Sequence, residues 1–108
     1  MTGKVESHKD LVVWQKSMDL VVLVYKLLDK LSKDERFALS DQIRRSVISI
    51  PSNIAEGKSR NSIREYKQFV GTAKGSVAEL ETQLLICERI GYLKKEEISK
   101  GISKNCNF

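Results

Sequence analysis

The chain has 108 residues, of which 41% are apolar and 31% charged, and its formal net charge is +5 at pH 7. This length suits one modest domain, and the longest apolar run, residues 20–25, is far shorter than the roughly 20 residues that a membrane helix needs. Residues 1–10 are polar and charged, without the apolar centre of a signal peptide, so we expect a cytoplasmic protein.

Apolar residues recur at three- and four-residue spacing along the chain, and this period predicts an all-α fold. The chain has one proline and six glycines, which are too few turn-forming residues for a protein of many short strands. The pattern predicts four helices within residues 10–104, with a flexible lead at 1–9 and a frayed tail at 105–108.

The first predicted helix runs from Asp10, whose carboxylate can cap the free amides of the first turn, to about Leu31. Its expected inward positions are Trp14, Met18, Val21, Tyr25, Leu28 and Leu31. Four further residues widen the apolar surface beyond the needs of one partner face, namely Leu20, Leu23, Val24 and Leu27. The extra surface fits a thick bundle core and a contact between subunits equally well.

The second predicted helix follows a connection in which Ser32 or Asp34 can act as the cap, and it stops at Gly57. Its expected inward positions are Phe37, Leu39, Ile43, Val47, Ile48, Ile50 and Ile54. Pro51 interrupts the pattern and removes one backbone hydrogen bond. We expect a kinked helix there, and the alternative is that one helix ends near Ile50 and another begins at Ser52.

The third predicted helix begins at a Ser62 cap and extends to about Ile90, before Gly91. Its expected inward positions are Tyr66, Phe69, Val70, Ala73, Val77, Leu80, Leu84, Cys87 and Ile90. Gly71 and Gly75 predict that another backbone approaches this helix closely. A fourth, short helix is expected from Lys94 onward, with Ile98 and Ile102 facing inward.

Positive charge is concentrated in one stretch of the chain. Residues 44–78 hold seven basic and two acidic side chains, so their net charge of +5 equals that of the whole protein. We expect the nucleic-acid-binding residues among Arg45, Lys58, Arg60, Arg64, Lys67 and Lys74. The spacing of Arg60, Arg64 and Lys67 predicts a row on one helical face that can follow a phosphate backbone. The alternative is a solvated face that only keeps the protein soluble.

A second group of polar residues is predicted to have a structural role. Its members are Arg44, Ser52, Asn53, Glu56 and Glu79. Arg44 and Arg45 point about 100° apart on a helix, so we expect at least one of them to pair with Glu79 or Glu81 of a neighbouring helix. The residues beside Pro51 can form either a small polar pocket or a network that holds the bend, and the network is the favoured interpretation.

Catalysis is disfavoured by the residues available. His8 is the only histidine and lies in the lead, so one chain cannot build a histidine-based triad or a two-histidine metal site. Cys87 and Cys106 match no metal-binding spacing, and we expect both to be reduced thiols. The sequence contains no phosphate-binding glycine loop and no dinucleotide fingerprint. We therefore expect neither an enzyme nor a bound cofactor or metal.

Three stretches resemble a known family: LVVWQKSMDLV at 11–21, QIRRSVISIPSNIAEG at 42–57 and GSVAELETQL at 75–84. Together they resemble the four-helix bundle family named after the protein encoded in 23S rRNA intervening sequences, over residues 9–98. The resemblance implies an antiparallel up-and-down bundle that assembles into a homopentamer. Accessory proteins of diversity-generating retroelements look like relatives, and these bind nucleic acid and partner a reverse transcriptase. The shortened fourth helix departs from the family pattern.

Two functional hypotheses follow from the sequence. The first is a non-enzymatic bundle subunit of a homo-oligomer, whose basic surface binds RNA or DNA. The second is a structural or adaptor protein that binds another protein through the apolar face of the first helix.

Overall fold

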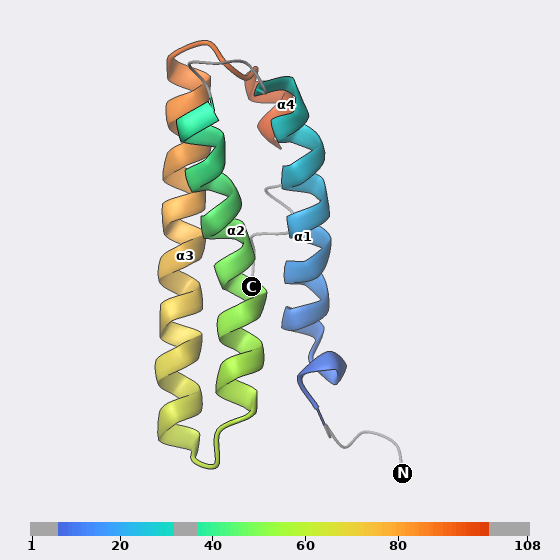
Figure 1. The fold of residues 1–108 in the computed structure, drawn as a ribbon, viewed down its shortest axis with the longest axis vertical. Helices are drawn as coiled ribbons and strands as arrows, with labels where there is room; N and C mark the ends of the chain where they lie inside the picture. Colours follow the sequence, from blue (N-terminus) through green and yellow to red (C-terminus); the bar gives the residue numbers. More distant parts are fainter. Residues whose placement is uncertain (1–6, 32–36, 100–108) are drawn as a thin grey trace.

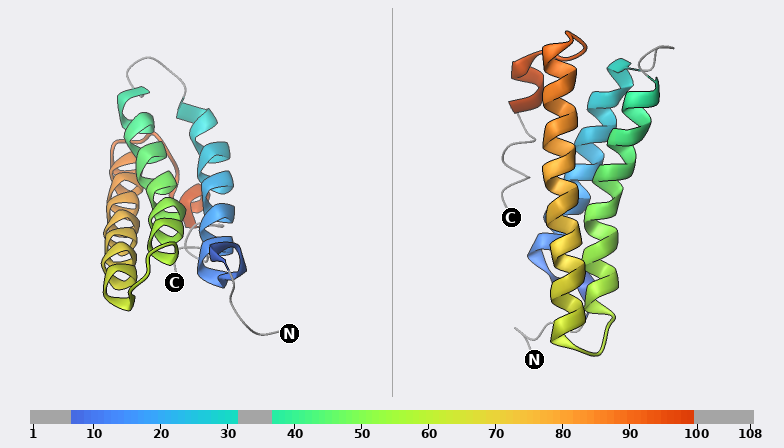
Figure 2. Two further views of the ribbon diagram at one scale, coloured as in Figure 1. Left: turned by 60° about the horizontal axis from the view of Figure 1, so that its bottom comes forward. Right: turned by 90° about the vertical axis from the view of Figure 1, so that its left-hand side faces the viewer.

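The structure is a computed structural model and describes residues 7–31 and 37–99. Every regular element in these ranges is helical, so the all-α prediction is confirmed. Three long helices, α1 (Val12–Leu28), α2 (Phe37–Lys58) and α3 (Ile63–Arg89), run antiparallel, and α2 packs against both of the others (Figures 1 and 2). The short α4 (Lys95–Ser99) lies beside the C-terminal end of α1 (Figure 1).

The start of α1 is built differently from the prediction. Ser7 caps a short 3-10 helix, η1 (His8–Asp10), and the Asp10 carboxylate accepts a bond from the Ser7 amide at 3.3 Å. The two residues form a reciprocal capping box. Leu11 then occupies the N-cap position of α1 without a side-chain cap, so the prediction that Asp10 caps this helix is wrong. A second 3-10 turn, η2 (Asp29–Leu31), extends the other end to the expected boundary.

The buried stripe of α1 is not the expected one. Leu20, Val24 and Leu28 are fully buried, whereas Met18 is 42% and Tyr25 37% exposed. Two apolar stripes overlap on this helix, and the position of α2 and α3 selects the one centred on Leu20 and Val24. Of the predicted inward set, Leu28 and Leu31 are buried, and the other members border an open surface described below.

The α2 helix is continuous through Pro51, so the alternative of two separate helices is wrong. Proline leaves the carbonyl four residues earlier without its backbone donor. Side chains add bonds to the adjacent carbonyls: Ser52 Oγ donates to Ile48 O at 2.9 Å, and Asn53 Nδ2 donates to Ser49 O at 2.7 Å. Pro51 itself is buried, and its ring joins the core side of the helix. Phe37 and Ile48, which we expected to face inward, are 61% and 42% exposed.

Gly57 has a packing role and does not end α2. The helix continues to Lys58, and among the described glycines only Gly91 has a positive φ. A Cβ at Gly57 would stand 2.8 Å from Phe69 Cβ and 3.2 Å from the Tyr66 carbonyl oxygen. The missing side chain therefore lets α2 and α3 approach closely next to their connection. The expected left-handed stop at Gly57 is wrong.

The boundaries of α3 agree with the predicted ones. Ser62 Oγ accepts a hydrogen bond from the Glu65 amide at 3.1 Å, which confirms the N-terminal cap. Gly91, at φ 84°, ends the helix, and the Tyr92 amide returns to Cys87 O at 2.8 Å. Gly71 and Gly75 face open space, so the close backbone approach predicted for them does not occur within the described chain. Ile90 is 53% exposed instead of inward-facing.

The short fourth helix is confirmed within the described residues. Leu93 is buried in the core and Ile98 packs against it. Lys30 of η2 pairs with Glu97, and Glu97 Oε1 also accepts from the Lys94 amide at 2.8 Å. The hydrogen bond from Lys30, followed by that from Lys94, lowers the pKa of Glu97. Ile102 and residues 105–108 lie outside the described residues.

Candidate nucleic-acid interface

The two adjacent arginines of α2 lie on its surface and make local contacts. Arg45 is highly exposed, and its Nε lies 3.3 Å from an Asp41 carboxylate oxygen one turn earlier. Arg44 donates to Ser40 Oγ at 3.3 Å, and its guanidinium lies 5.5 Å from the centre of the Tyr25 ring of α1. One of the two arginines does form an ion pair, but the predicted partners Glu79 and Glu81 are wrong, because Arg45 pairs with Asp41 of its own helix and Arg44 is turned toward α1.

Arg60 lies in the turn between α2 and α3. Its Nη2 is 2.7 Å from a Glu56 carboxylate oxygen, and the guanidinium lies 5.0 Å from the centre of the Phe69 ring. Since α3 begins only at Ile63, the prediction that Arg60 continues the helical row of Arg64 and Lys67 is wrong. Its charge is already offset by Glu56, so Arg60 contributes less to a free positive surface than its sequence position indicates.

The remaining basic residues of this stretch form a row along α3. Arg64, Lys67 and Lys74 are all exposed, and we name them the α3 basic row. Positions three and ten residues apart recur on one side of a helix, here the side opposite the buried Ser76 and Leu80. Within the described part of the chain, none of the three has an ion-pair partner. The outside of α3 therefore carries three exposed cations that no described carboxylate neutralises.

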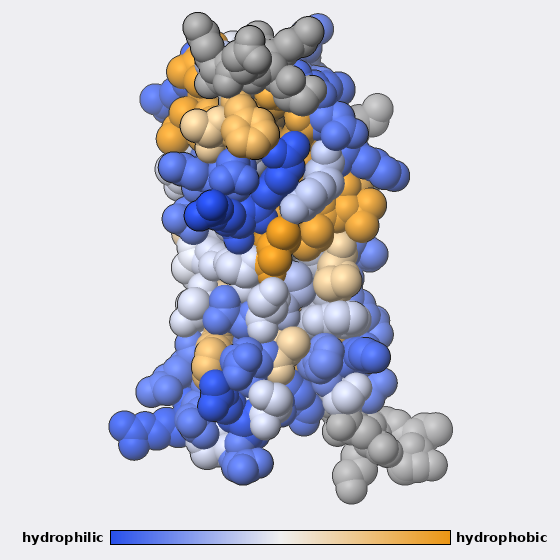
Figure 3. Space-filling view, in the orientation of Figure 1, coloured by the Kyte–Doolittle hydropathy of each residue, from blue (hydrophilic) through white to orange (hydrophobic). Residues whose placement is uncertain are grey.

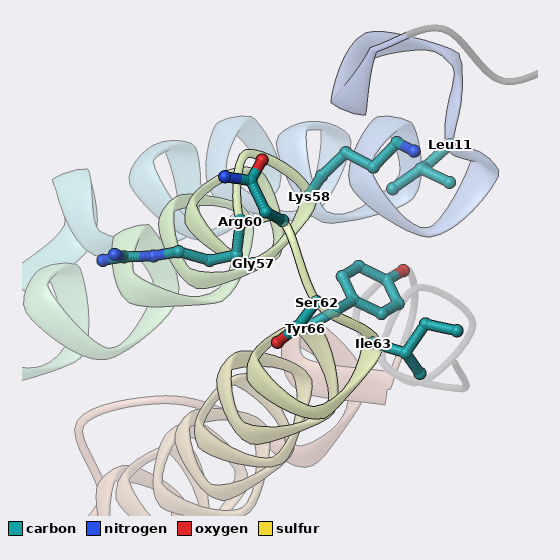
Figure 4. Close-up of a pocket in the computed structure, with 8 residues that line it drawn as sticks. Leu11, Gly57, Lys58, Arg60, Ser62, Ile63 and Tyr66 are labelled. Carbon is teal, nitrogen blue, oxygen red and sulfur yellow. The ribbon is translucent and has the colours of Figure 1, made fainter.

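Lys58 lies apart from this row, at the end of the bundle. It is partly buried and lines a pocket between the α2–α3 turn and the start of α1 (Figure 4). The six predicted nucleic-acid-binding residues thus fall into three places: Arg45 on α2, Lys58 with Arg60 around the turn, and the α3 basic row.

The predicted polar network is dispersed in the structure. Ser52 and Asn53 bond to carbonyls of their own helix, and Glu56 pairs with Arg60. Arg44 contacts Tyr25 of α1, as described above, and Glu79 of α3 reaches α2, where its Oε1 is 3.1 Å from Ser46 Oγ. The five residues of the predicted network therefore do not form one cluster around Pro51.

The true interhelical network joins α2 and α3 at positions that the sequence analysis missed. Ser46 Oγ lies 2.9 Å from Gln83 Oε1, and Ser49 bonds to Ser76. Ser46, Ser76 and Gln83 are at least nine-tenths buried. The signal was available in the sequence, because small polar residues recur at helical spacing on both helices. Apolar periodicity does not indicate these positions, because their buried side chains are polar.

An apolar groove lies between α1 and α2 on the face shown in Figure 3, where apolar surface over α1 is bordered by hydrophilic residues. Met18, Val22, Tyr25 and Ile48 are each more than a third exposed there. We name this surface the α1–α2 groove; it is lined chiefly by Trp14, Met18, Val21, Val22, Tyr25, Ile48, Pro51 and Ala55. On α1 the groove is formed largely by positions that were expected to face inward, whereas three of the four residues expected to be excess, Leu20, Val24 and Leu27, lie in the core.

The described residues offer no constellation for metal chemistry. They contain no group of three or more His, Cys, Asp or Glu side chains that could hold an ion. His8 packs edge-on against Trp14 with ring centres 5.1 Å apart. Cys87 is a buried free thiol, and its burial raises its pKa. None of the described helices combines the length and the apolar character needed to cross a bilayer.

Comparison with known proteins agrees with this architecture. The family model described as 23S rRNA-intervening sequence protein matches residues 9–107. The chain belongs to this family. The match spans the three long helices and the short α4, and it confirms the resemblance seen in the sequence. A search of curated proteins finds no match to the chain.

Proposed function

We propose that this protein is a non-enzymatic, cytoplasmic bundle subunit that assembles with copies of itself and binds RNA or DNA through its phosphate backbone. The α3 basic row is the observation that carries the nucleic-acid part. Three exposed cations on one side of a long helix, none engaged by a carboxylate within the described residues, are available to a polyanion. Contacts to phosphates release condensed counterions, which drives such binding.

The geometry of the row suits backbone contacts without sequence readout. At 1.5 Å per residue, Arg64 and Lys74 are about 15 Å apart along the helix axis, a span of several nucleotides. The positions between them on the same side include Gly71, whose lack of a side chain leaves the backbone open to solvent. Phosphate contacts fix the position of a nucleic acid but carry no sequence information directly. We therefore expect broad, salt-sensitive binding.

Assembly is supported by the α1–α2 groove. Partly exposed apolar side chains from two helices meet there, and a second copy of the chain would remove them from water. The groove is on the α1 side of the bundle, whereas the α3 basic row is on the outside of α3. Self-association through the groove would thus leave the row free and repeat it on every subunit. The family resemblance suggests five subunits.

Charge reversal tests nucleic-acid binding. We expect the triple variant Arg64→Glu, Lys67→Glu, Lys74→Glu to bind single-stranded RNA at least about tenfold more weakly than the original protein at low salt, with a shallower salt dependence. The measurement is fluorescence anisotropy with a labelled oligonucleotide between low and physiological salt.

The matched control is Lys9→Glu, Lys16→Glu, Lys95→Glu, which changes the net charge equally at exposed positions elsewhere. If both triple variants lose affinity alike, only overall charge matters. If the α3 triple variant binds RNA as tightly as the original protein, the nucleic-acid proposal is wrong.

Light scattering tests assembly. We expect a mass several times that of one 12.3 kDa chain at micromolar concentration, and a monomer for Ile48→Glu. Trp14 is the only tryptophan and lines the groove, so its emission should shift to longer wavelength when the assembly is diluted. A monomeric original protein would contradict the subunit proposal.

A second candidate function is favoured by the same groove. As a structural or adaptor protein, the chain would use the α1–α2 groove to bind a different protein. The mass measurement separates the two candidates, because an adaptor of this kind stays monomeric by itself and leaves Trp14 partly exposed until its partner is added.

A further inference from the structure

The pocket at the end of the bundle offers a chemical environment that the α3 basic row does not. It has a volume of about 300 Å³ and lies between the α2–α3 turn and the residue that precedes α1. Its walls include the partly buried Lys58 and Tyr66 together with Leu11, Asn61 and Ile63. Charged, amide, aromatic and aliphatic groups thus converge on one small cavity.

The cation of this pocket is Lys58. Figure 4 shows its side chain extending toward Leu11 on one side of the pocket, with the Tyr66 ring on the other. Lys58 has no ion-pair partner among the described residues. Arg60 also borders the pocket, but its guanidinium points away from Lys58 and Tyr66 (Figure 4) and is engaged by Glu56 and Phe69. An anion in the pocket would therefore be held by Lys58.

The α2 backbone at Gly57 holds the Tyr66 ring in place. The ring lies over the α2 backbone, since a Cβ at Gly57 would stand 3.3 Å from Tyr66 Cδ1. The ring is nevertheless partly exposed on the pocket side. A fixed, accessible aromatic ring is the surface on which nucleobases stack in proteins that bind single strands. The neighbouring Asn61 has a carboxamide that can both donate and accept hydrogen bonds at the edge of a base.

The pocket and part of the α3 basic row lie along the same side of α3. Ile63 lines the pocket, and Lys67 and Lys74 follow it at intervals of four and seven residues, which keeps all three on one side of α3. A strand whose backbone follows the row toward the start of α3 would reach the pocket next.

We propose that this pocket takes one nucleotide of a single-stranded nucleic acid, with the base packed on Tyr66 and the adjoining phosphate held by Lys58. This inference rests on the proposed nucleic-acid binding and makes it specific for unpaired bases, because a base within a duplex cannot enter the cavity. The α3 basic row supplies general affinity for phosphates, and the pocket supplies the preference for single strands.

The experiment compares three ligands: a uridine 12-mer, an RNA duplex of the same length and inorganic polyphosphate. We expect Tyr66→Leu to weaken binding of the single strand by about fivefold or more. Binding of the duplex and of polyphosphate should stay the same, because neither places a base in the pocket. Tyr66→Phe keeps the ring and should behave like the original protein. Lys58→Gln should weaken the single strand while leaving the duplex unchanged.

A direct readout is photocrosslinking. An oligonucleotide that contains 5-iodouridine should crosslink to Tyr66, identified by mass spectrometry of the digested protein, and the yield should fall in Lys58→Gln. Circular dichroism establishes that each variant is folded. A folded Tyr66→Leu variant that binds the single strand as tightly as the original protein overturns the pocket proposal. The α3 triple variant decides the general function separately, since it does not alter the pocket.

Discussion

The α2 helix meets its two long neighbours in contrasting ways. Toward α3 it presents Gly57 and a series of serines, and the two helices approach closely around a buried polar network. Toward α1 it contributes to the apolar core on one side and to an open groove on the other. The α2–α3 contact is satisfied within one chain, whereas the α1–α2 contact leaves apolar surface that a further molecule can cover.

The largest expected effect concerns the close approach at Gly57. Gly57→Leu places a side chain where even a Cβ would be 2.8 Å from Phe69 Cβ, so we expect a loss of about 3 kcal/mol in the free energy of unfolding. Urea denaturation followed by circular dichroism measures it. Gly75→Leu is the matched control, because the same substitution there meets open space. Equal stability of the two variants would remove close packing as the basis of the α2–α3 contact.

A smaller effect is expected from the buried network. Gln83→Leu leaves Ser46 without one of its partners and should cost about 1–2 kcal/mol of stability. The double variant Ser46→Ala, Gln83→Leu should recover part of this loss, because both polar groups are then absent. Additive losses in a double-mutant cycle would mean that the two side chains do not interact.

A stabilising change is expected at an open glycine. Gly71→Ala should raise the free energy of unfolding by about 1 kcal/mol, since alanine favours the helix and nothing lies within 4 Å of the added methyl. Urea denaturation at low protein concentration measures the effect on the separate chain. A destabilised variant would indicate that another part of the chain covers Gly71.

The smallest expected effect concerns the attachment of α4 to η2. The hydrogen bond from Lys30 lowers the pKa of Glu97, so this contact is complete above the usual glutamate pKa and is lost as pH falls through the lowered value. The amide of Lys94, which donates to Glu97 at 2.8 Å, should report this loss in its NMR chemical shift. Glu97→Gln should abolish the pH response, and Glu96→Gln should preserve it.

Prediction from sequence succeeded where the signal was local. The Ser62 cap and the Gly91 stop depend on neighbouring backbone geometry, and both are confirmed. It failed where two local signals competed. A glycine at position 57 is compatible both with the end of a helix and with close packing against another helix. Only the position of Phe69 distinguishes the two roles. The predicted row of Arg60, Arg64 and Lys67 is wrong for a related reason. Its helical spacing requires one helix through all three residues, whereas α3 begins only at Ile63.

The candidate site was predicted only in part. The concentration of charge in residues 44–78 located the right segment, but spacing alone could not tell which charges are engaged. Arg45 and Arg60 pair with acidic residues one turn away, while Lys67 and Lys74 have no such partner in the described residues. The sequence did not predict the pocket around Lys58 and Tyr66, because it forms only where Leu11 meets residues 57–66 from a distant part of the chain.

The sequence by itself determined that this protein is helical, approximately where its helices begin and end, and which family it resembles, because helix formation and capping depend on residues within one or two turns. The tertiary structure alone decided which of two apolar stripes on α1 is buried, which cations stay free and where a pocket forms. Those properties depend on which helix lies beside which, and so on contacts between residues far apart in the chain.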